Sequence, residues 1–234
     1  MTFGKGLMSA AGLRVVVLSA SFALGVSGVC APLLFGQAST QVSAQELAAR
    51  VDRHYDQLHS LKAGFEEDYA GLGMTRTETG TLFLRKPGQM LWRYTTPAGK
   101  IFLLDGKFAW LYTQGDAQVQ RISAKELDDL RSPLRFLLGH TELEKELSGL
   151  KIVAAANGNY TLSGVPKGHE DRVTRLSLTV NAAGAIAAIE IVEVDGATTR
   201  FTFTDQQSDA PIPAGTFHFT PPPGVPVVDA MPPV

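Results

Sequence analysis

Residues 82–94, LFLRKPGQMLWRY, decide the fold of this chain, because two runs of large apolar side chains flank a turn at Pro87-Gly88. A strand with one face in water alternates apolar and polar residues. Here Leu82, Phe83 and Leu84 are all apolar, so both faces of this strand need a cover. A curved sheet that leaves an apolar hollow under a few helices would meet that need.

The sequence on both sides of this hairpin has the pattern of short strands. Turn signals such as Asp105-Gly106 and Asn157-Gly158 separate them, and loops this short join antiparallel strands. Strands are predicted at 62–70, 75–85, 89–96, 100–104, 107–113, 117–122, 151–156, 159–164, 172–180, 185–194 and 198–205.

Two segments have helical features instead. Apolar residues recur at intervals of four, four and three at Leu47, Val51, Tyr55 and Leu58. This spacing predicts an amphipathic helix over 45–61 that covers the sheet. Helices are also predicted within 123–147, where Ser132-Pro133 can start one and the apolar run LRFLL follows.

Residues 1–44 have the features of an export signal. Lys5 and Arg14 precede an apolar run at 15–29 that is too short for a comfortable membrane span. Cleavage is expected after Ala44, or alternatively after Ala38, which leaves a single domain over 45–234. In favour of Ala38, Ser43 to Glu46 match a helix capping box that cleavage after Ala44 would break.

Charge and cysteine content exclude several classes of protein. Val29 and Ser27 do not fit a lipoprotein signal, so the only cysteine, Cys30, is not expected to carry lipid. Removal of Lys5 and Arg14 with the signal takes the net charge from −2 to about −4. Such a chain has no basic patch for nucleic acid and no polybasic stretch for an anionic membrane.

Motifs for chemistry are missing from the sequence. It contains no nucleophile elbow, no phosphate-binding glycine loop, and no His or Cys partners at metal-ligand spacing. The acidic run Glu66-Glu67-Asp68 is expected to lie on a solvated face. The sequence therefore predicts neither an enzyme nor a protein with a cofactor or metal. What it does contain is an excess of large apolar residues between 65 and 112, which calls for a second layer, a partner or a ligand.

Four stretches, taken in order, resemble the signatures of the LolA family of periplasmic outer-membrane lipoprotein carriers. They are GTLFLRKPGQMLWRYTTP (80–97), FLLDGKFAWLY (102–112), SPLRFLLG (132–139) and FHFTPPPGVPV (217–227). The resemblance spans roughly residues 45–229. It implies an α+β fold, namely an unclosed antiparallel β-barrel or strongly curved sheet whose helices form a lid over an apolar cavity.

The resemblance also implies a function and partners. Such a carrier works in the periplasm as a monomer and takes acylated lipoproteins from an inner-membrane ATP-driven releasing complex to an outer-membrane acceptor. Two alternatives stay open on the sequence: an outer-membrane lipoprotein acceptor of the same fold, and a periplasmic regulator that senses lipid or lipoprotein.

The expected site residues follow from the same resemblance. The cavity is assigned to Leu82, Leu84, Met90, Trp92, Tyr94, Phe65 and Trp110, and the lid to Leu134, Phe136, Leu137 and Leu138. Where the family often has an arginine that bonds to the lid helices, this chain has Lys86, with Arg85 beside it as the other candidate.

The hairpin turn must satisfy one condition if the even-numbered residues face the cavity together. A plain two-residue turn at Pro87-Gly88 would pair Leu84 with Leu91 and split the set. The sequence therefore predicts a bulged or odd-length turn there.

Overall fold

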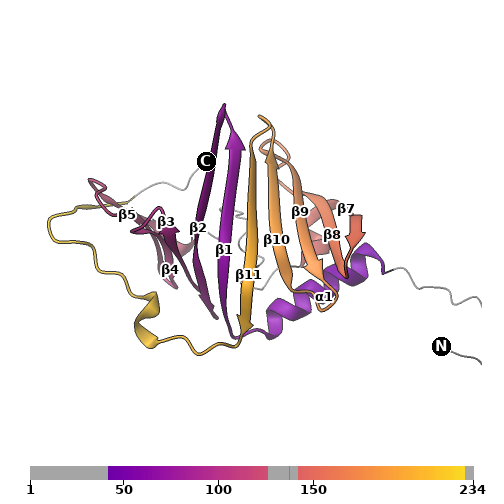
Figure 1. Cartoon of the computed structure of the whole chain (residues 1–234), viewed down its shortest axis with the longest axis horizontal. Helices are drawn as coiled ribbons and strands as arrows, with labels where there is room; N and C mark the ends of the chain where they lie inside the picture. The colour runs from indigo at the N-terminus through magenta and orange to yellow at the C-terminus, as the bar shows by residue number, and fades with distance from the viewer. Residues whose placement is uncertain (1–41, 126–136, 138–141, 230–234) are drawn as a thin grey trace, which may run out of the picture. The chain divides into compact units, whose positions relative to one another are not determined.

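The computed structural model describes residues 42–125, 137 and 142–229 (Figure 1). Residues 1–41 of the predicted export signal and the lid residues Leu134, Phe136 and Leu138 lie outside the described residues. The helices are α1 (Ala44–Gln57), α4 (Leu143–Glu146) and the 3-10 helix η1 (Ala214–Phe217). The strands are β1 (Ser60–Gly71), β2 (Met74–Arg85), β3 (Gln89–Thr96), β4 (Lys100–Asp105), β5 (Phe108–Thr113), β6 (Val119–Ser123), β7 (Leu147–Ala156), β8 (Asn159–Pro166), β9 (Val173–Asn181), β10 (Ile186–Glu193), β11 (Thr198–Ser208) and β12 (Val227–Asp229).

Within the described residues the strands form one 12-stranded sheet in the order β12-β6-β5-β4-β3-β2-β1-β11-β10-β9-β8-β7. The two meanders join where β1 pairs with β11, which Figure 1 shows side by side in purple and orange. All neighbours are antiparallel except β12, which pairs with β6 in parallel. Because β12 and β7 stand at the two ends of this order, the sheet is unclosed, as predicted.

The hairpin between β2 and β3 has the odd-length turn that the sequence predicts. Arg85 pairs with Gln89, so the loop holds three residues, from Lys86 to Gly88. Leu84 then stands opposite Met90, and Leu82 opposite Trp92. The even-numbered side chains therefore point to the same side of the sheet, here called the inner face, and the register prediction is confirmed.

Helix α1 covers part of the inner face. Its start is confirmed, since the Ser43 hydroxyl accepts a hydrogen bond of 3.1 Å from the Glu46 backbone N–H. The predicted end at residue 61 is wrong, because the helix stops at Gln57 and Leu58 is already extended. Leu58 is buried although it lies beyond the helix, so its apolar spacing could not reveal the end of the helix.

The ends of strands β9 and β10 hold α1 in place. The Arg50 side chain donates a hydrogen bond to the Ala182 carbonyl, and the Ile186 N–H donates one to the Tyr55 hydroxyl. Between these strands, Gly184 has φ of 92°, and a Cβ there would clash with the Arg50 carbonyl. The turn thus approaches the helix as closely as only glycine allows.

Two apolar clusters lie on opposite faces of the sheet. The larger one, on the inner face, joins α1 to the even-numbered residues of β2 and β3. The smaller one, on what is here called the outer face, contains Leu91, Leu103 and Phe217, so the C-terminal segment covers that side. None of the helices among the described residues is long and apolar enough to cross a membrane.

Candidate functional site

The inner face carries a wall of large apolar side chains. Leu82, Leu84, Met90 and Trp92 are buried in the larger cluster, and Trp92 is only 1% exposed. Phe65 packs its ring edge-on against Trp92, with centroids 4.7 Å apart. Five of the expected cavity residues therefore share one face, because β1, β2 and β3 are adjacent and in matching register.

Helix α1 and Leu137 close one end of this wall. Leu47 and Val51 of α1 belong to the same cluster. Leu137 is the one described residue of the expected lid, and its side chain is 1% exposed within that cluster. At the end where Met90 lies, the chain's own side chains therefore fill the space beneath the helix.

Lys86 links the hairpin turn to the C-terminal end of α1. Its ammonium donates a hydrogen bond to the Tyr55 carbonyl, which satisfies one of the free carbonyls at the helix end. Partial burial lowers the pKa of Lys86, while the nearby Asp56 carboxylate opposes this shift. The described contact of Lys86 is thus with α1.

Arg85 does not share the position of Lys86. Successive side chains of a strand point to opposite faces, so Arg85 reaches the outer face. There its guanidinium donates to the Ile212 carbonyl and lies 5.0 Å from the centroid of the Phe217 ring. The assignment of Arg85 as an alternative contact on the lid side is corrected accordingly.

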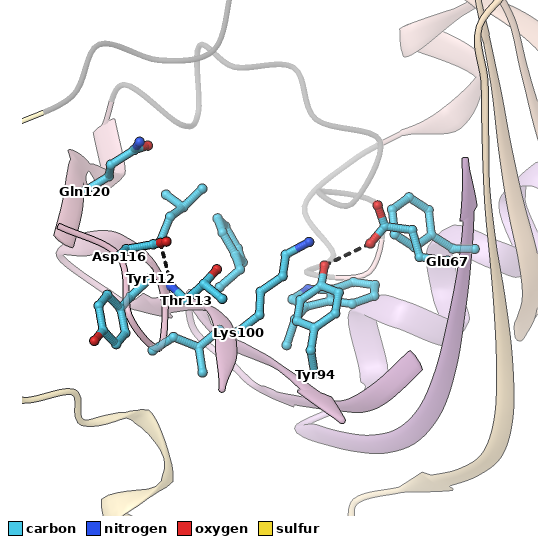
Figure 2. A pocket seen from close by; sticks show the side chains of 12 residues that line it. Glu67, Tyr94, Lys100, Tyr112, Thr113, Asp116 and Gln120 are labelled. Carbon is cyan, nitrogen blue, oxygen red and sulfur yellow. Dashed lines mark hydrogen bonds between the residues drawn. The ribbon is translucent and has the colours of Figure 1, made fainter. Parts of the chain in front are cut away.

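A pocket of about 400 Å³ opens on the inner face at the end remote from α1 (Figure 2). Its floor is apolar and continues the buried wall: Trp92, Phe102, Leu111 and Phe201. Its rim is polar: Glu67, Tyr94, Lys100, Thr113, Asp116 and Gln120. An arrangement of this kind suits an amphiphile, whose apolar part contacts the floor while its head group meets the rim.

Trp110 is not part of this pocket, and its assignment to the cavity is wrong. It stands opposite Leu103 and belongs to the outer-face residues that pack around Leu91, Leu103 and Phe217. The indole N–H of Trp110 donates a hydrogen bond of 2.8 Å to the Asp105 carboxylate. Its neighbour Leu111 points inward instead and lines the floor.

Tyr94 lies where the wall meets the polar rim. Its hydroxyl donates a hydrogen bond of 2.8 Å to the Glu67 carboxylate, drawn in Figure 2. Burial raises the pKa of Tyr94 and the Glu67 charge raises it further, so the phenol stays protonated. Tyr94 therefore acts as a fixed hydrogen-bond donor.

Glu67 corrects the expectation that residues 66–68 form a solvated face. Glu66 is exposed, but Glu67 is only 9% exposed and stands directly opposite Glu78, which is 4% exposed. The signal was present in the sequence, because alternation from Phe65 places Glu67 on the same face. Its charge alone does not indicate a solvated position, since a buried carboxylate is stable when it is paired.

Asp52 connects α1 to α4. Its carboxylate oxygens accept hydrogen bonds of 3.2 and 3.3 Å from the Leu143 backbone N–H, at the start of α4. Burial raises the pKa of Asp52 from 3.8 to about 6, although this hydrogen bond favours the ionised form. In the part of the chain that the structure describes, no group of His, Cys, Asp and Glu side chains is arranged to hold a metal.

Known proteins agree with this architecture. Residues 56–220 match the family model described as "Outer membrane lipoprotein carrier protein LolA". The outer-membrane lipoprotein carrier protein of Cupriavidus necator is 31% identical over 157 residues, which cover 66% of this chain and 72% of that relative. The one from Proteus mirabilis is 29% identical over 204 residues, or 86% of this chain and 96% of the relative.

Among solved structures, an uncharacterized conserved protein from Thermus thermophilus is similar with a TM-score of 0.51 at 12% identity. The likeness covers 80% of this chain and 99% of that one and bears on the fold alone. The family match extends over most of the chain and includes every strand from β1 to β11. This chain therefore belongs to the LolA family.

Proposed function

We propose that this chain is a periplasmic chaperone that binds the acyl chains of lipoproteins released from the inner membrane and delivers them to the outer membrane. The observation that carries the proposal is the pocket of about 400 Å³ beside Trp92, whose apolar floor the described side chains leave open. Its volume lies in the range of about 300–1,000 Å³ that ligand sites occupy. The names of the relatives from C. necator and P. mirabilis support the same function.

The wall next to the floor supplies further acyl-binding surface in this proposal. The buried wall and the pocket floor form one continuous apolar face, which consists of Leu82, Leu84, Met90, Trp92, Phe65, Phe102 and Leu111. Leu137 moves aside when a guest enters, and an acyl chain then replaces its side chain against α1. The empty protein in this way keeps its apolar wall out of water.

The energetics of lipid transfer define the partners. Each buried methylene contributes about 0.8 kcal/mol, so a long acyl chain is held in a membrane by roughly 10 kcal/mol or more. A carrier with a partly open pocket cannot supply that energy alone. An inner-membrane ATP-driven releasing complex must therefore donate the lipoprotein, and an outer-membrane acceptor must bind it more tightly than the carrier. The carrier itself acts as a monomer and catalyses no reaction.

A charge on the pocket floor tests the function. Leu111→Glu places a carboxylate on the floor of the pocket, where an acyl chain cannot solvate it. The variant is expected to bind a dipalmitoylated lipopeptide at least tenfold more weakly than the parent, as measured by displacement of a fluorescent fatty-acid probe.

The control is the same substitution outside the pocket. Val153 of β7 is an apolar side chain that is already 51% exposed, so Val153→Glu should leave binding unchanged. Thermal unfolding of both variants establishes that they are folded. Lipopeptide binding by Leu111→Glu at the parent's affinity would rule out this pocket as the acyl site.

A further inference from the structure

The tip of the β1–β2 hairpin, residues 71–74, exposes two large apolar side chains. Leu72 is 82% exposed and Met74 is 57% exposed, the two highest values among the large apolar residues that the structure describes. Strand β2 pairs with β3 only from Thr79 onward, so Met74 lies beyond the end of β3. Figure 1 shows the hairpin extending past the ends of β3 and β11. The two side chains therefore lie at a projecting end of the sheet.

The turn at this tip does not need a leucine. Gly71 pairs with Met74, so the loop has two residues, and both have left-handed backbone, with φ of 51° at Leu72 and 77° at Gly73. Such a turn prefers Asn, Asp or Gly at its first position, because other side chains are strained there. Leu72 gains no burial in return. A strained apolar residue in an exposed turn indicates a role other than folding.

The residues just behind the tip are of the types that gather where lipid meets water. Tyr69 and Arg76 stand opposite each other on β1 and β2, and the Arg76 guanidinium lies 5.6 Å from the centroid of the Tyr69 ring. Both side chains have an apolar body and a polar end, which suits them to a membrane interface. Residues 69–77 contain no acidic side chain, so burial of the tip in lipid would desolvate no carboxylate of this segment.

The tip lies at the same end of the sheet as the pocket. Glu67 of β1 lines the pocket and precedes Leu72 by five residues. Because a strand rises about 3.4 Å per residue, the tip stands roughly 17 Å beyond Glu67 along the strand direction. Helix α1 is at the opposite end, where Lys86 contacts the Tyr55 carbonyl. A surface that receives the tip is therefore on the pocket side of the molecule.

We propose that the tip of the β1–β2 hairpin contacts a lipid bilayer: Leu72 and Met74 enter its acyl region, while Tyr69 and Arg76 lie among the head groups. Two side chains bury less apolar surface than a myristoyl chain, which by itself gives only reversible binding of about 10⁴ M⁻¹. The contact is therefore transient, and the protein returns to solution between encounters. Its role, to hold the pocket beside the bilayer while an acyl chain enters or leaves, rests on the proposed function, but the contact itself does not.

A fluorescent label at the tip tests the contact. The chain from residue 39 onward has no cysteine, so Met74→Cys provides a single attachment site for the polarity-sensitive dye NBD. With vesicles of neutral phosphatidylcholine, the labelled empty protein should show brighter, blue-shifted emission that saturates with lipid concentration. Val153→Cys with the same dye is the control, since this β7 residue is also exposed and should not respond. No response at position 74, which would leave the tip to a protein partner, or an equal response at both positions, would overturn the proposal.

Leu72→Asn tests the apolar side chain without disturbing the turn, because Asn accepts left-handed backbone. Burial of a leucine side chain corresponds to about tenfold or more in affinity, so in the labelled protein this change should raise the half-maximal lipid concentration by that factor. The midpoint of urea unfolding should stay the same or increase. An unchanged lipid requirement would overturn the proposal, and a lower midpoint would do so by assigning Leu72 to the fold.

Binding of the dipalmitoylated lipopeptide separates this inference from the proposed function. Leu72→Asn should bind the lipopeptide with the parent's affinity, because Leu72 is remote from the pocket floor, and a large loss would place Leu72 in the acyl site instead. Failure of the lipopeptide to displace the fatty-acid probe from the parent would overturn the carrier function, while a response of the tip label to vesicles would still establish the bilayer contact.

Discussion

Gly80 makes room for an aromatic ring on the inner face. Gly80 lies on β2, directly opposite Phe65 of β1. A Cβ at position 80 would lie 2.7 Å from the Phe65 ring and would clash with the Arg93 carbonyl. The Phe65 ring in turn contacts Trp92 and Tyr94, at centroid distances of 4.7 and 5.0 Å. Gly80 therefore fixes the aromatic group that borders the pocket.

Gly80→Ala is expected to lower the free energy of unfolding by about 1–3 kcal/mol, because overpacking forces Phe65 out of its position. Urea unfolding followed by tryptophan fluorescence measures the loss. Gly215→Ala in η1 is the control, since nothing lies within 4 Å of a Cβ there. A loss of similar size in both variants would contradict this account of Gly80.

Residue-level predictions succeeded where alternation could be followed from one known turn. The loop of three residues at Pro87 places Leu82, Leu84, Met90 and Trp92 on one face, which is the condition that the assignment by resemblance required. Trp110 was misplaced because its side depends on two further turns, whose lengths the sequence does not determine. Glu67 was misplaced because its charge was given more weight than its position in the strand.

At the scale of elements, the contact between α1 and α4 depends on a half-buried carboxyl. Because the pKa of Asp52 is raised, the folded protein binds this proton more tightly than the unfolded chain does. The contribution of Asp52 to stability is therefore greatest at low pH and decreases as pH rises from about 4 through about 6. Above that window it is constant, since Asp52 is ionised in both states.

Asp52→Asn should abolish this decrease, because an amide does not titrate in this pH range. The contact with α4 is kept, since the amide oxygen can still accept from the Leu143 N–H. The variant's stability relative to the parent is expected to rise between about pH 4 and about pH 6 and then to level off, as measured by urea unfolding at a series of pH values. Asp171→Asn, on the exposed connection between β8 and β9, serves as the control. A difference between Asp52→Asn and the parent that does not vary with pH would refute the role assigned to this carboxyl.

Periodicity identified most elements but not all of their limits. The strand segments were predicted because short loops and turn residues separate them. The helical region is predicted to extend to residue 147, but Leu147 is the first residue of strand β7. Leu147 is buried in the larger cluster, and an apolar residue between a helix and a strand satisfies either pattern.

At the scale of the whole molecule, the proposed function requires that the cover of the inner face can be displaced from the wall. Leu137→Ala is expected to increase the affinity for an apolar fluorescent probe, because the side chain no longer competes for the wall. Leu84→Ala should instead lower the free energy of unfolding by about 2–5 kcal/mol, since Leu84 belongs to the sheet itself. Unchanged or weaker probe binding by Leu137→Ala would show that Leu137 is a fixed part of the core.

The joining of the two meanders could not be predicted from local pattern. Hairpin signals define which strands are neighbours in sequence, but nothing in the residues of β1 or β11 indicates that they pair. The unclosed sheet was expected only through the resemblance to the LolA family.

The pairing of β1 with β11 has a consequence for how such a chain is made. Leu61 lies opposite Ser208, so the centre of the sheet forms only after almost the whole polypeptide is present. Pairings between residues so distant in sequence form slowly. A chain that is synthesised from its N-terminus therefore remains incompletely folded until β11 has been made and can pair with β1.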